Sequence, residues 1–344
     1  MSGMLLESLP DEVISSIDVR DAWRRRQARS SSGLEFLVSD VLRWPPGSTV
    51  RVAFLDGDDA LHADVAAATE QTTDTCNLTL DFGVDVSGGH RRWTEADTTH
   101  AAEIRVSFDL SGYWSLVGTD STDEMVGAPT HTAGGRPGQR SLNLGGFKTN
   151  RPPDWRGTVR HEFLHAFGFK HAHQNLRGPC ETEFRWEDDE GYVPTRNANW
   201  VFVADAAGRR PGIYTYLAGE PNNWPKSKVD HNLRTDVSDD TVAGPFDRES
   251  VMLYRFEPFF YKSDPSPCFP TTDGVELSDG DRRGLKLLYP ETAESLSRIV
   301  ARAEAALAEV AVGAEAGLEG GVTPSPYEAR AVELASAMVA QLNP

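Results

Sequence analysis

The stretch that decides the fold of this chain is His161-Glu162-Phe163-Leu164-His165-Ala166-Phe167-Gly168-Phe169-Lys170-His171. His161 and His165 are four positions apart, so both imidazoles project from one face of a helix. Gly168 can end that helix, because glycine adopts a left-handed backbone conformation without a steric penalty. The chain then turns and brings His171 back toward the first two histidines.

The residue types in this stretch indicate a metal centre. Three neutral imidazoles with an open fourth position are the donor set of a catalytic Zn²⁺. The carboxylate of Glu162 can take a proton from water at that open position. A surface helix that carries histidines by chance is the alternative, but it leaves unexplained why three of the nine histidines fall at ligand spacing. We therefore predict that His161, His165 and His171 hold Zn²⁺ and that Glu162 is a general base.

A second motif, Ser250-Val251-Met252-Leu253-Tyr254, follows further along the chain. With it the chain resembles the metzincin metallopeptidases, in which a methionine turn follows the long zinc motif. The resemblance implies that Met252 lies beneath the zinc as an apolar floor. It also implies that Tyr254, as in the astacin and serralysin branches, ligates or approaches the metal and donates a hydrogen bond to the developing oxyanion. Taken alone, Met252 fits an ordinary core methionine equally well.

The remaining pattern suits the same family. Alternating residues predict strands over 49–54, 78–82 and 104–108, and the Ala-rich segment 61–72 has helical periodicity. The segment 277–290 resembles the last helix of a metzincin catalytic domain. The resemblance covers about residues 45–290. It implies an α+β fold with a twisted mixed sheet, an active-site helix, a horizontal cleft and an irregular lower subdomain.

Two segments lie outside that catalytic domain of residues 45–290. Residues 1–44 form a lead segment and a candidate pro-segment, in which Val13, Ile17, Val19 and Trp23 predict an amphipathic helix. Residues 291–344 depart from the family domain. Two runs of apolar residues at helical spacing, separated by a Gly-rich break, predict a helical hairpin that packs on the catalytic domain or binds a partner.

A substrate-binding strand is implied by the resemblance. In metzincins, the strand corresponding to Leu142, Asn143, Leu144 and Gly145 is the exposed edge of the sheet above the zinc. An extended peptide adds to such an edge through main-chain hydrogen bonds, which demand no particular sequence. An ordinary internal strand is the alternative.

The three cysteines allow at most one disulfide. Cys180 and Cys268 can pair, since they follow the zinc motif and the methionine turn, whereas three reduced thiols are the alternative. Cys76 lies within the catalytic domain and no cysteine precedes it, so a thiol from the lead segment cannot hold the enzyme latent. Astacin-like latency uses an aspartate, for which the lead segment offers Asp11, Asp18, Asp21 and Asp40.

Composition limits the partners. The net charge of −18 argues against nucleic acid or an anionic membrane as partner. No apolar run approaches the roughly 18 residues of a membrane helix. The first residues show neither a basic region nor a long apolar region, so no secretory signal is visible, although the family resemblance favours secretion. The compartment is therefore left open.

The other six histidines are expected to serve structural roles. His173 can substitute for His171 as a ligand, but the motif spacing favours His171. The remaining ones stand alone in the sequence, and isolated histidines are more often structural than catalytic: His62, His90, His100, His131 and His231.

The motifs together predict a zinc endopeptidase that acts on protein or peptide substrates. One alternative is a zinc-bearing module that recognises an extended peptide without cutting it, although such a module has no use for the base Glu162. Another is an intracellular effector or toxin peptidase whose tail serves targeting. The absence of a visible signal is the support for that alternative.

Overall fold

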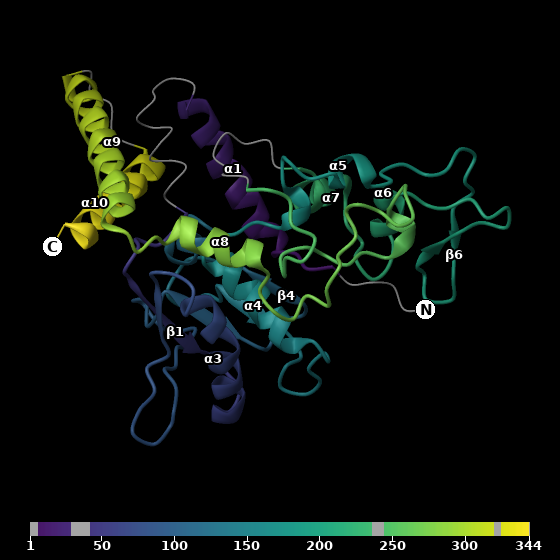
Figure 1. The fold of residues 1–344 in the computed structure, drawn as a ribbon, viewed down its shortest axis with the longest axis horizontal. Coiled ribbons are helices and arrows are strands. Elements are labelled where there is room, and N and C mark those ends of the chain that lie inside the picture. The colour runs from purple at the N-terminus through teal and green to yellow at the C-terminus, as the bar shows by residue number, and fades with distance from the viewer. Residues whose placement is uncertain (1–5, 29–41, 236–243, 320–324, 344) are drawn as a thin grey trace. The chain divides into compact units, whose positions relative to one another are not determined.

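The computed structural model describes residues 6–28, 42–235, 244–319 and 325–343 (Figure 1). The chain divides into two compact units. Unit 1 consists of Met1–Ser8, Lys170–Ser238 and Val242–Gly280, and unit 2 of Leu9–Phe169, Asp239–Thr241 and Asp281–Pro344. Among the described residues, no helix is both long and apolar enough to cross a membrane.

Unit 2 contains a mixed five-stranded sheet in the order β2-β1-β3-β5-β4. The strands are β1 (Thr49–Phe54), β2 (Thr79–Asp81), β3 (Ile104–Ser107), β4 (Tyr113–Ser115) and β5 (Leu142–Leu144). Pairing is parallel from β2 to β5, with Val52 opposite Ile104 and Val106 opposite Leu142. The strand β4 pairs antiparallel with β5. The predicted mixed α+β fold is confirmed.

The predicted position of residues 142–145 at the sheet edge is wrong. β5 lies between β3 and β4, and all three of its residues are fully buried. The buried amide of Asn143 donates to the carbonyls of Leu110 and Gly112, and Gly145 N donates to Gly112 O. The main-chain N–H of Gly145, which an added peptide strand would need as a donor, is therefore already used inside the protein. Within the described sheet, β4 is the edge on this side.

Two helices of unit 2 cover the sheet. Helix α3 (Asp59–Thr73) begins after Asp58, whose carboxylate accepts a hydrogen bond from Leu61 N at 2.8 Å. Helix α4 (Trp155–Ala166) packs against α3, β4 and β5. Its apolar residues Phe163 and Leu164, with Phe167 beyond its end, are fully buried. Burial of this face fixes the rotation of the helix and so the direction of its polar residues.

The lead segment forms helix α1 (Asp11–Ala28), as predicted. Val13 and Ile17 are buried in a cluster with Trp114 and Leu116, but Val19 is exposed. The inward face continues one turn after Ile17 at Arg20, which is buried and donates from Nη2 to Asp120 Oδ2 at 3.1 Å. Val19 therefore lies on the solvent face of the helix.

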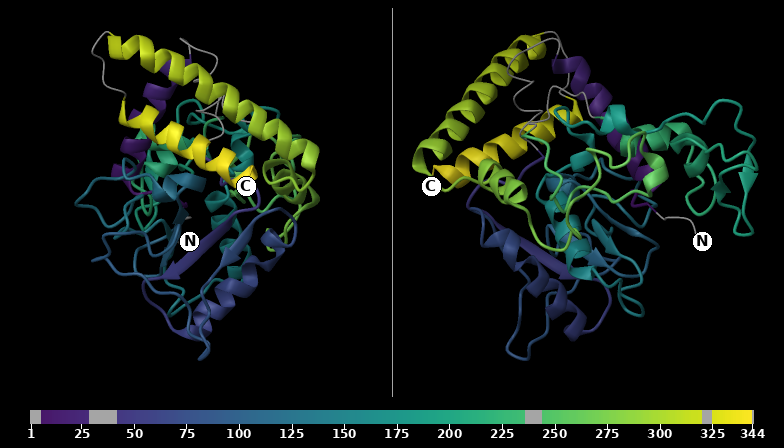
Figure 2. Two further views of the ribbon diagram at one scale, coloured as in Figure 1. Left: turned by 90° about the vertical axis from the view of Figure 1, so that its left-hand side faces the viewer. Right: turned by 45° about the vertical axis from the view of Figure 1, so that its right-hand side comes forward.

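The described part of unit 2 also contains the 3-10 helix η1 (Gly118–Thr122) and the helices α8, α9 and α10. Helix α8 (Asp279–Leu288) buries Leu285. Helices α9 (Ala293–Glu319) and α10 (Pro326–Leu342) contact each other and form a helical pair (Figure 2). The hairpin is also tied to the sheet-bearing part of unit 2, because Arg330 donates to Thr122 Oγ1 at 2.8 Å and Gln341 to Gly47 O at 3.3 Å.

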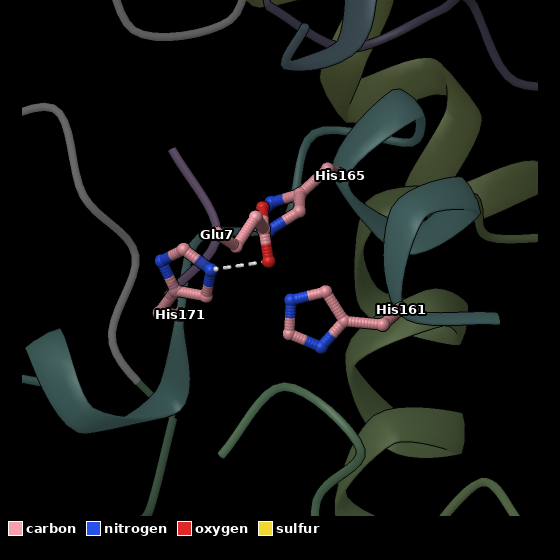
Figure 3. A group of neighbouring side chains, drawn as sticks. All are labelled: Glu7, His161, His165 and His171. Atoms are coloured by element: carbon pink, nitrogen blue, oxygen red, sulfur yellow. Dashed lines mark hydrogen bonds and ion pairs between the residues drawn. The ribbon is translucent and has the colours of Figure 1, made fainter. Parts of the chain in front are cut away.

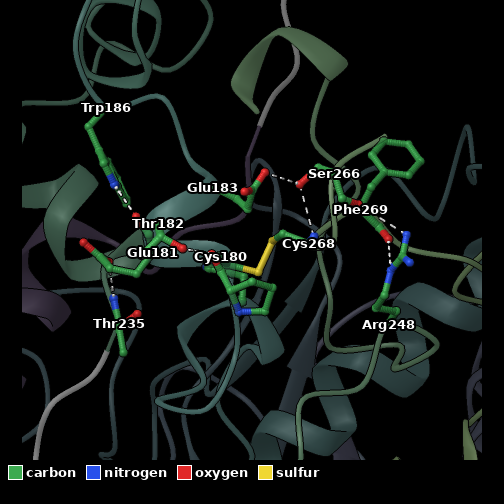
Figure 4. Close-up of a disulfide and its surroundings, with 12 residues drawn as sticks. Cys180, Glu181, Thr182, Glu183, Trp186, Thr235, Arg248, Ser266, Cys268 and Phe269 are labelled. Atoms are coloured by element: carbon green, nitrogen blue, oxygen red, sulfur yellow. Dashed lines mark hydrogen bonds between the residues drawn. A yellow bond between two sulfur atoms is a disulfide. The ribbon is translucent and has the colours of Figure 1, made fainter. Parts of the chain in front are cut away.

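Unit 1 is largely irregular and has an aromatic core. Its regular elements are η2 (Ala172–Gln174), α5 (Cys180–Glu183), β6 (Thr195–Arg196), β7 (Phe202–Val203), α6 (Ile213–Leu217), α7 (Lys226–Leu233) and η3 (Pro258–Phe260). A disulfide joins Cys180 to Cys268 inside this core, and Ser266 bridges to Glu183 beside it (Figure 4). Cys76 is a free, buried cysteine of unit 2, and burial raises the pKa of its thiol to about 12.

Candidate active site

Helix α4 presents two of the predicted metal ligands. His161 and His165 lie one turn apart, with ring centroids 4.9 Å apart, and both side chains are buried. Figure 3 shows them projecting from neighbouring turns of the helix. Their common direction follows from the four-residue spacing and from the burial of the opposite, apolar face. The structure therefore brings these two predicted residues together.

The tautomer of His165 suits a metal ligand. Its Nδ1 lies 2.8 Å from the carbonyl oxygen of Phe169. A carbonyl only accepts, so Nδ1 carries the proton and Nε2 keeps its lone pair. Metal-bound histidines usually show this arrangement, in which a hydrogen bond to one nitrogen orients the ring and leaves the other for the metal.

The end of α4 is held by contacts from distant parts of unit 2. Gly168 has a φ of +96°, in the left-handed region, which confirms its predicted role. Trp44 Nε1 donates to Ala166 O at 2.8 Å, and the buried hydroxyl of Tyr289 donates to Phe167 O at 2.7 Å. These donors satisfy carbonyls that a helix end leaves without an internal partner.

Glu162 is buried on α4, next to His161. The edge strand β4 contacts the same helix. The negative charge of Glu162 acts on the pKa of Tyr113 in that strand. Burial, and then the negative charges of Asp154 and Glu162, raise the pKa of Tyr113. Tyr113 could not be predicted from the sequence, because its proximity to Glu162 depends on how β4 packs against α4.

Unit 1 places the third histidine beside the predicted tyrosine. The rings of His171 and Tyr254 have centroids 4.4 Å apart. Tyr254 donates its hydroxyl hydrogen to Glu7 Oε2 at 2.7 Å, and the same oxygen lies 3.5 Å from His171 Nε2 (Figure 3). The lead-segment carboxylate at these groups is thus a glutamate, whereas the family resemblance implied an aspartate.

His173 and Met252 support this part of unit 1. His173 is buried, its ring stacks on Tyr254 with a centroid distance of 5.0 Å, and its Nε2 lies 3.0 Å from Asn232 O. One of its nitrogens is thus engaged away from a metal. Met252 is buried, and its carbonyl accepts from Ala172 N at 2.9 Å. The methionine turn is therefore tied to the residue that follows His171.

Figure 3 draws four side chains that each offer a metal-ligand atom: Glu7 and His171 from unit 1, and His161 and His165 from unit 2. Imidazole nitrogen with a carboxylate oxygen is a donor combination that Zn²⁺ accepts. The protonated Nδ1 of His165 and the burial of the helix ligands agree with that fit.

The chain is similar to several solved structures. A structure of myroilysin matches with a TM-score of 0.50 and 24% identity, over 73% of this chain and 97% of that chain. A crystal structure of myroilysin matches with a TM-score of 0.41 and 22% identity, over 73% and 86%. High choriolytic enzyme 1, a hatching enzyme zinc-protease from the medaka fish Oryzias latipes, matches with a TM-score of 0.38 and 16% identity, over 73% and 96%.

No protein-family model and no curated protein sequence matches the chain. The likeness to myroilysin is therefore one of structure. It shows that the chain has the fold of myroilysin, which agrees with the mixed α+β fold predicted from the sequence.

Proposed function

We propose that this chain is a zinc-dependent endopeptidase. The observation that carries the proposal is helix α4, which presents His161 and His165 on one face with the buried carboxylate of Glu162 beside them. The carbonyl of Phe169 leaves Nε2 of His165 unprotonated for a metal. The fold shared with myroilysin adds support.

In this proposal His161, His165 and His171 hold Zn²⁺. The metal, when bound, polarises the scissile carbonyl and lowers the pKa of water toward about 7. Glu162 accepts a proton from the attacking water and returns it to the leaving amine. The Tyr254 hydroxyl donates a hydrogen bond to the developing oxyanion, and the buried Met252 supplies an apolar floor.

We further propose that an extended substrate adds to the outer edge of β4. Among the described residues this strand has a sheet partner on one side only, and it contacts the helix that carries Glu162. Main-chain hydrogen bonds along Tyr113–Ser115 would orient a peptide without selecting its sequence. The strand over residues 142–145 supports β4 from the inside of the sheet.

We also propose that residues 1–44 act as a pro-segment, 45–290 as the catalytic domain and 291–344 as a helical tail. The carboxylate of Glu7 supports a latent role for the lead, because it contacts both His171 and Tyr254. An anionic oxygen at these two groups competes with water and substrate. Helix α1 packs within unit 2, so deleting the lead segment would also remove part of that core. The variant Glu7→Gln tests latency while it leaves helix α1 in place.

The test is cleavage of a diverse peptide library by zinc-loaded chains. The wild type or Glu7→Gln should cut, whereas Glu162→Gln should bind zinc and not cut. Tyr254→Phe should bind zinc and lose about one to three orders of magnitude in turnover.

The same assay can also contradict the proposed peptidase function. If the wild type, Glu7→Gln and a chain without residues 1–44 all bind zinc and cut nothing, the chain is not a peptidase. Peptide binding without cleavage would then identify a recognition module.

A further inference from the structure

A second cluster of metal-binding side chains lies in unit 2, outside the zinc motif. It consists of Asp59, His62 and His90, each of which offers one ligand atom, and these atoms lie within 4.8 Å of one another. The two histidines appear isolated in the sequence, but helix α3 and the loop after β2 bring them together. None of the three residues belongs to the proposed peptidase site.

His62 is held as a neutral ligand. Its ring is fully buried and stacks on Phe54 with a centroid distance of 4.0 Å. Nε2 lies 2.8 Å from the carbonyl of Asp56 and therefore carries the proton. Nδ1 keeps a lone pair, has no hydrogen-bond partner in the described part of the chain, and lies 3.7 Å from Asp59 Oδ1. This is the orientation found in metal-bound histidines.

His90, like His62, has a buried ring nitrogen, Nδ1, without a hydrogen-bond partner among the described residues. Its ring lies edge-on to that of His62, with centroids 5.7 Å apart. Two such nitrogens beside one carboxylate are an unusual loss of hydrogen bonding in a folded interior. A divalent cation would satisfy both nitrogens and the carboxylate at once.

The charges around the cluster are compatible with a cation. Asp59 contributes a carboxylate that is 69% exposed and can rotate toward His62. Its neighbour Asp58 caps α3, so Asp59 is not needed for that role. Arg92 Nη1 lies 3.2 Å from His62 Nε2, the nitrogen opposite the proposed ligand atom. The Arg92 guanidinium is held there by donating to Leu55 O and Gly57 O.

We propose that Asp59, His62 Nδ1 and a ring nitrogen of His90 bind a zinc-class divalent cation that ties the loop after β2 to the start of α3. Two imidazoles favour Zn²⁺ over Mg²⁺ or Ca²⁺, which prefer oxygen ligands. Tetrahedral Zn²⁺ with bonds of about 2.1 Å places its ligand atoms roughly 3.4 Å apart. The 3.7 Å separation of His62 Nδ1 and Asp59 Oδ1 is close to that value.

Native mass spectrometry of the full chain titrated with Zn²⁺ tests the proposal. The wild type should bind two zinc ions and Asp59→Asn should weaken one of them at least tenfold. His62→Phe, which keeps an aromatic ring against Phe54, should bind a single ion. Asp64→Asn is the matched control, because it removes another partly exposed carboxylate of α3 that pairs instead with Arg151.

The second site is distinguishable from the peptidase site. A chain with His161→Gln and His165→Gln should still bind one ion, and zinc should slow hydrogen exchange in residues 83–92 of that chain. Adding Asp59→Asn should abolish this protection. Equal zinc stoichiometry and affinity in the wild type and Asp59→Asn, with no zinc effect on residues 83–92, would overturn the proposal and leave the peptidase site untouched.

Discussion

Removing the disulfide should strongly destabilise unit 1. Cys180 and Cys268 are 88 positions apart, and closing a loop of that length in the unfolded chain corresponds to about 4.6 kcal/mol at 25 °C in the chain-entropy relation. Both residues are buried in the aromatic core, so alanine also leaves a small gap at each position. We expect the double variant Cys180→Ala and Cys268→Ala to lose about 3–5 kcal/mol of unfolding free energy.

Hydrogen exchange measured on peptides by mass spectrometry is the suitable assay, because it reports unit 1 and unit 2 separately. Protection should fall across 180–268 and persist in the sheet of unit 2. Cys76→Ala is the matched control, since Cys76 lies in unit 2 and outside the loop. That change should cost about 1 kcal/mol, as is common for a small buried truncation.

Alkylation of the unfolded chain checks the premise. Without reductant one thiol should react, and with reductant all three cysteines should. Three reactive thiols without reductant would refute the disulfide itself. An intact disulfide whose removal changes the unfolding free energy of unit 1 by less than about 1 kcal/mol would refute the loop-entropy reasoning.

Three other changes probe the end of the active-site helix and the irregular part of unit 1. Tyr289→Phe should cost about 1–3 kcal/mol in urea unfolding, because it leaves the buried Phe167 carbonyl without this donor. Gly168→Ala should cost about 1–2 kcal/mol in the same assay; the φ of +96° is the cause, since the nearest atom to the new Cβ is at an ordinary 3.4 Å. Burial disfavours the charged form of Asp205, but backbone donors from Val193 and Arg209 lower its pKa to about 2 from 3.8. Its stabilising contribution is therefore present above about pH 4 and lost as pH falls toward 2, so Asp205→Asn should flatten the acid dependence of the urea midpoint over that range.

The local features of the fold follow from short-range rules. The spacing of His161 and His165 predicts a common helix face, and the glycine at position 168 predicts the left-handed turn that ends the helix. The tail hairpin likewise follows from helical periodicity on either side of a Gly-rich break. Each of these inferences depends on neighbours within a few positions, where backbone geometry leaves few alternatives.

Pairings between distant segments could not be predicted in the same way. The position of residues 142–145 inside the sheet depends on which strand closes its edge, and both Leu142–Leu144 and Tyr113–Ser115 are short strands with similar patterns. The proximity of Glu7 to Tyr254 and that of His62 to His90 are of the same kind.

The physical reason is that many distant pairings have nearly the same loop-closure entropy, which grows slowly with chain length. The choice among them comes from the packing of the whole core. The sequence therefore specifies the chemistry of the zinc motif and the helix that carries it. Tertiary packing selects the edge strand, the carboxylate beside His171 and the partners of the isolated histidines.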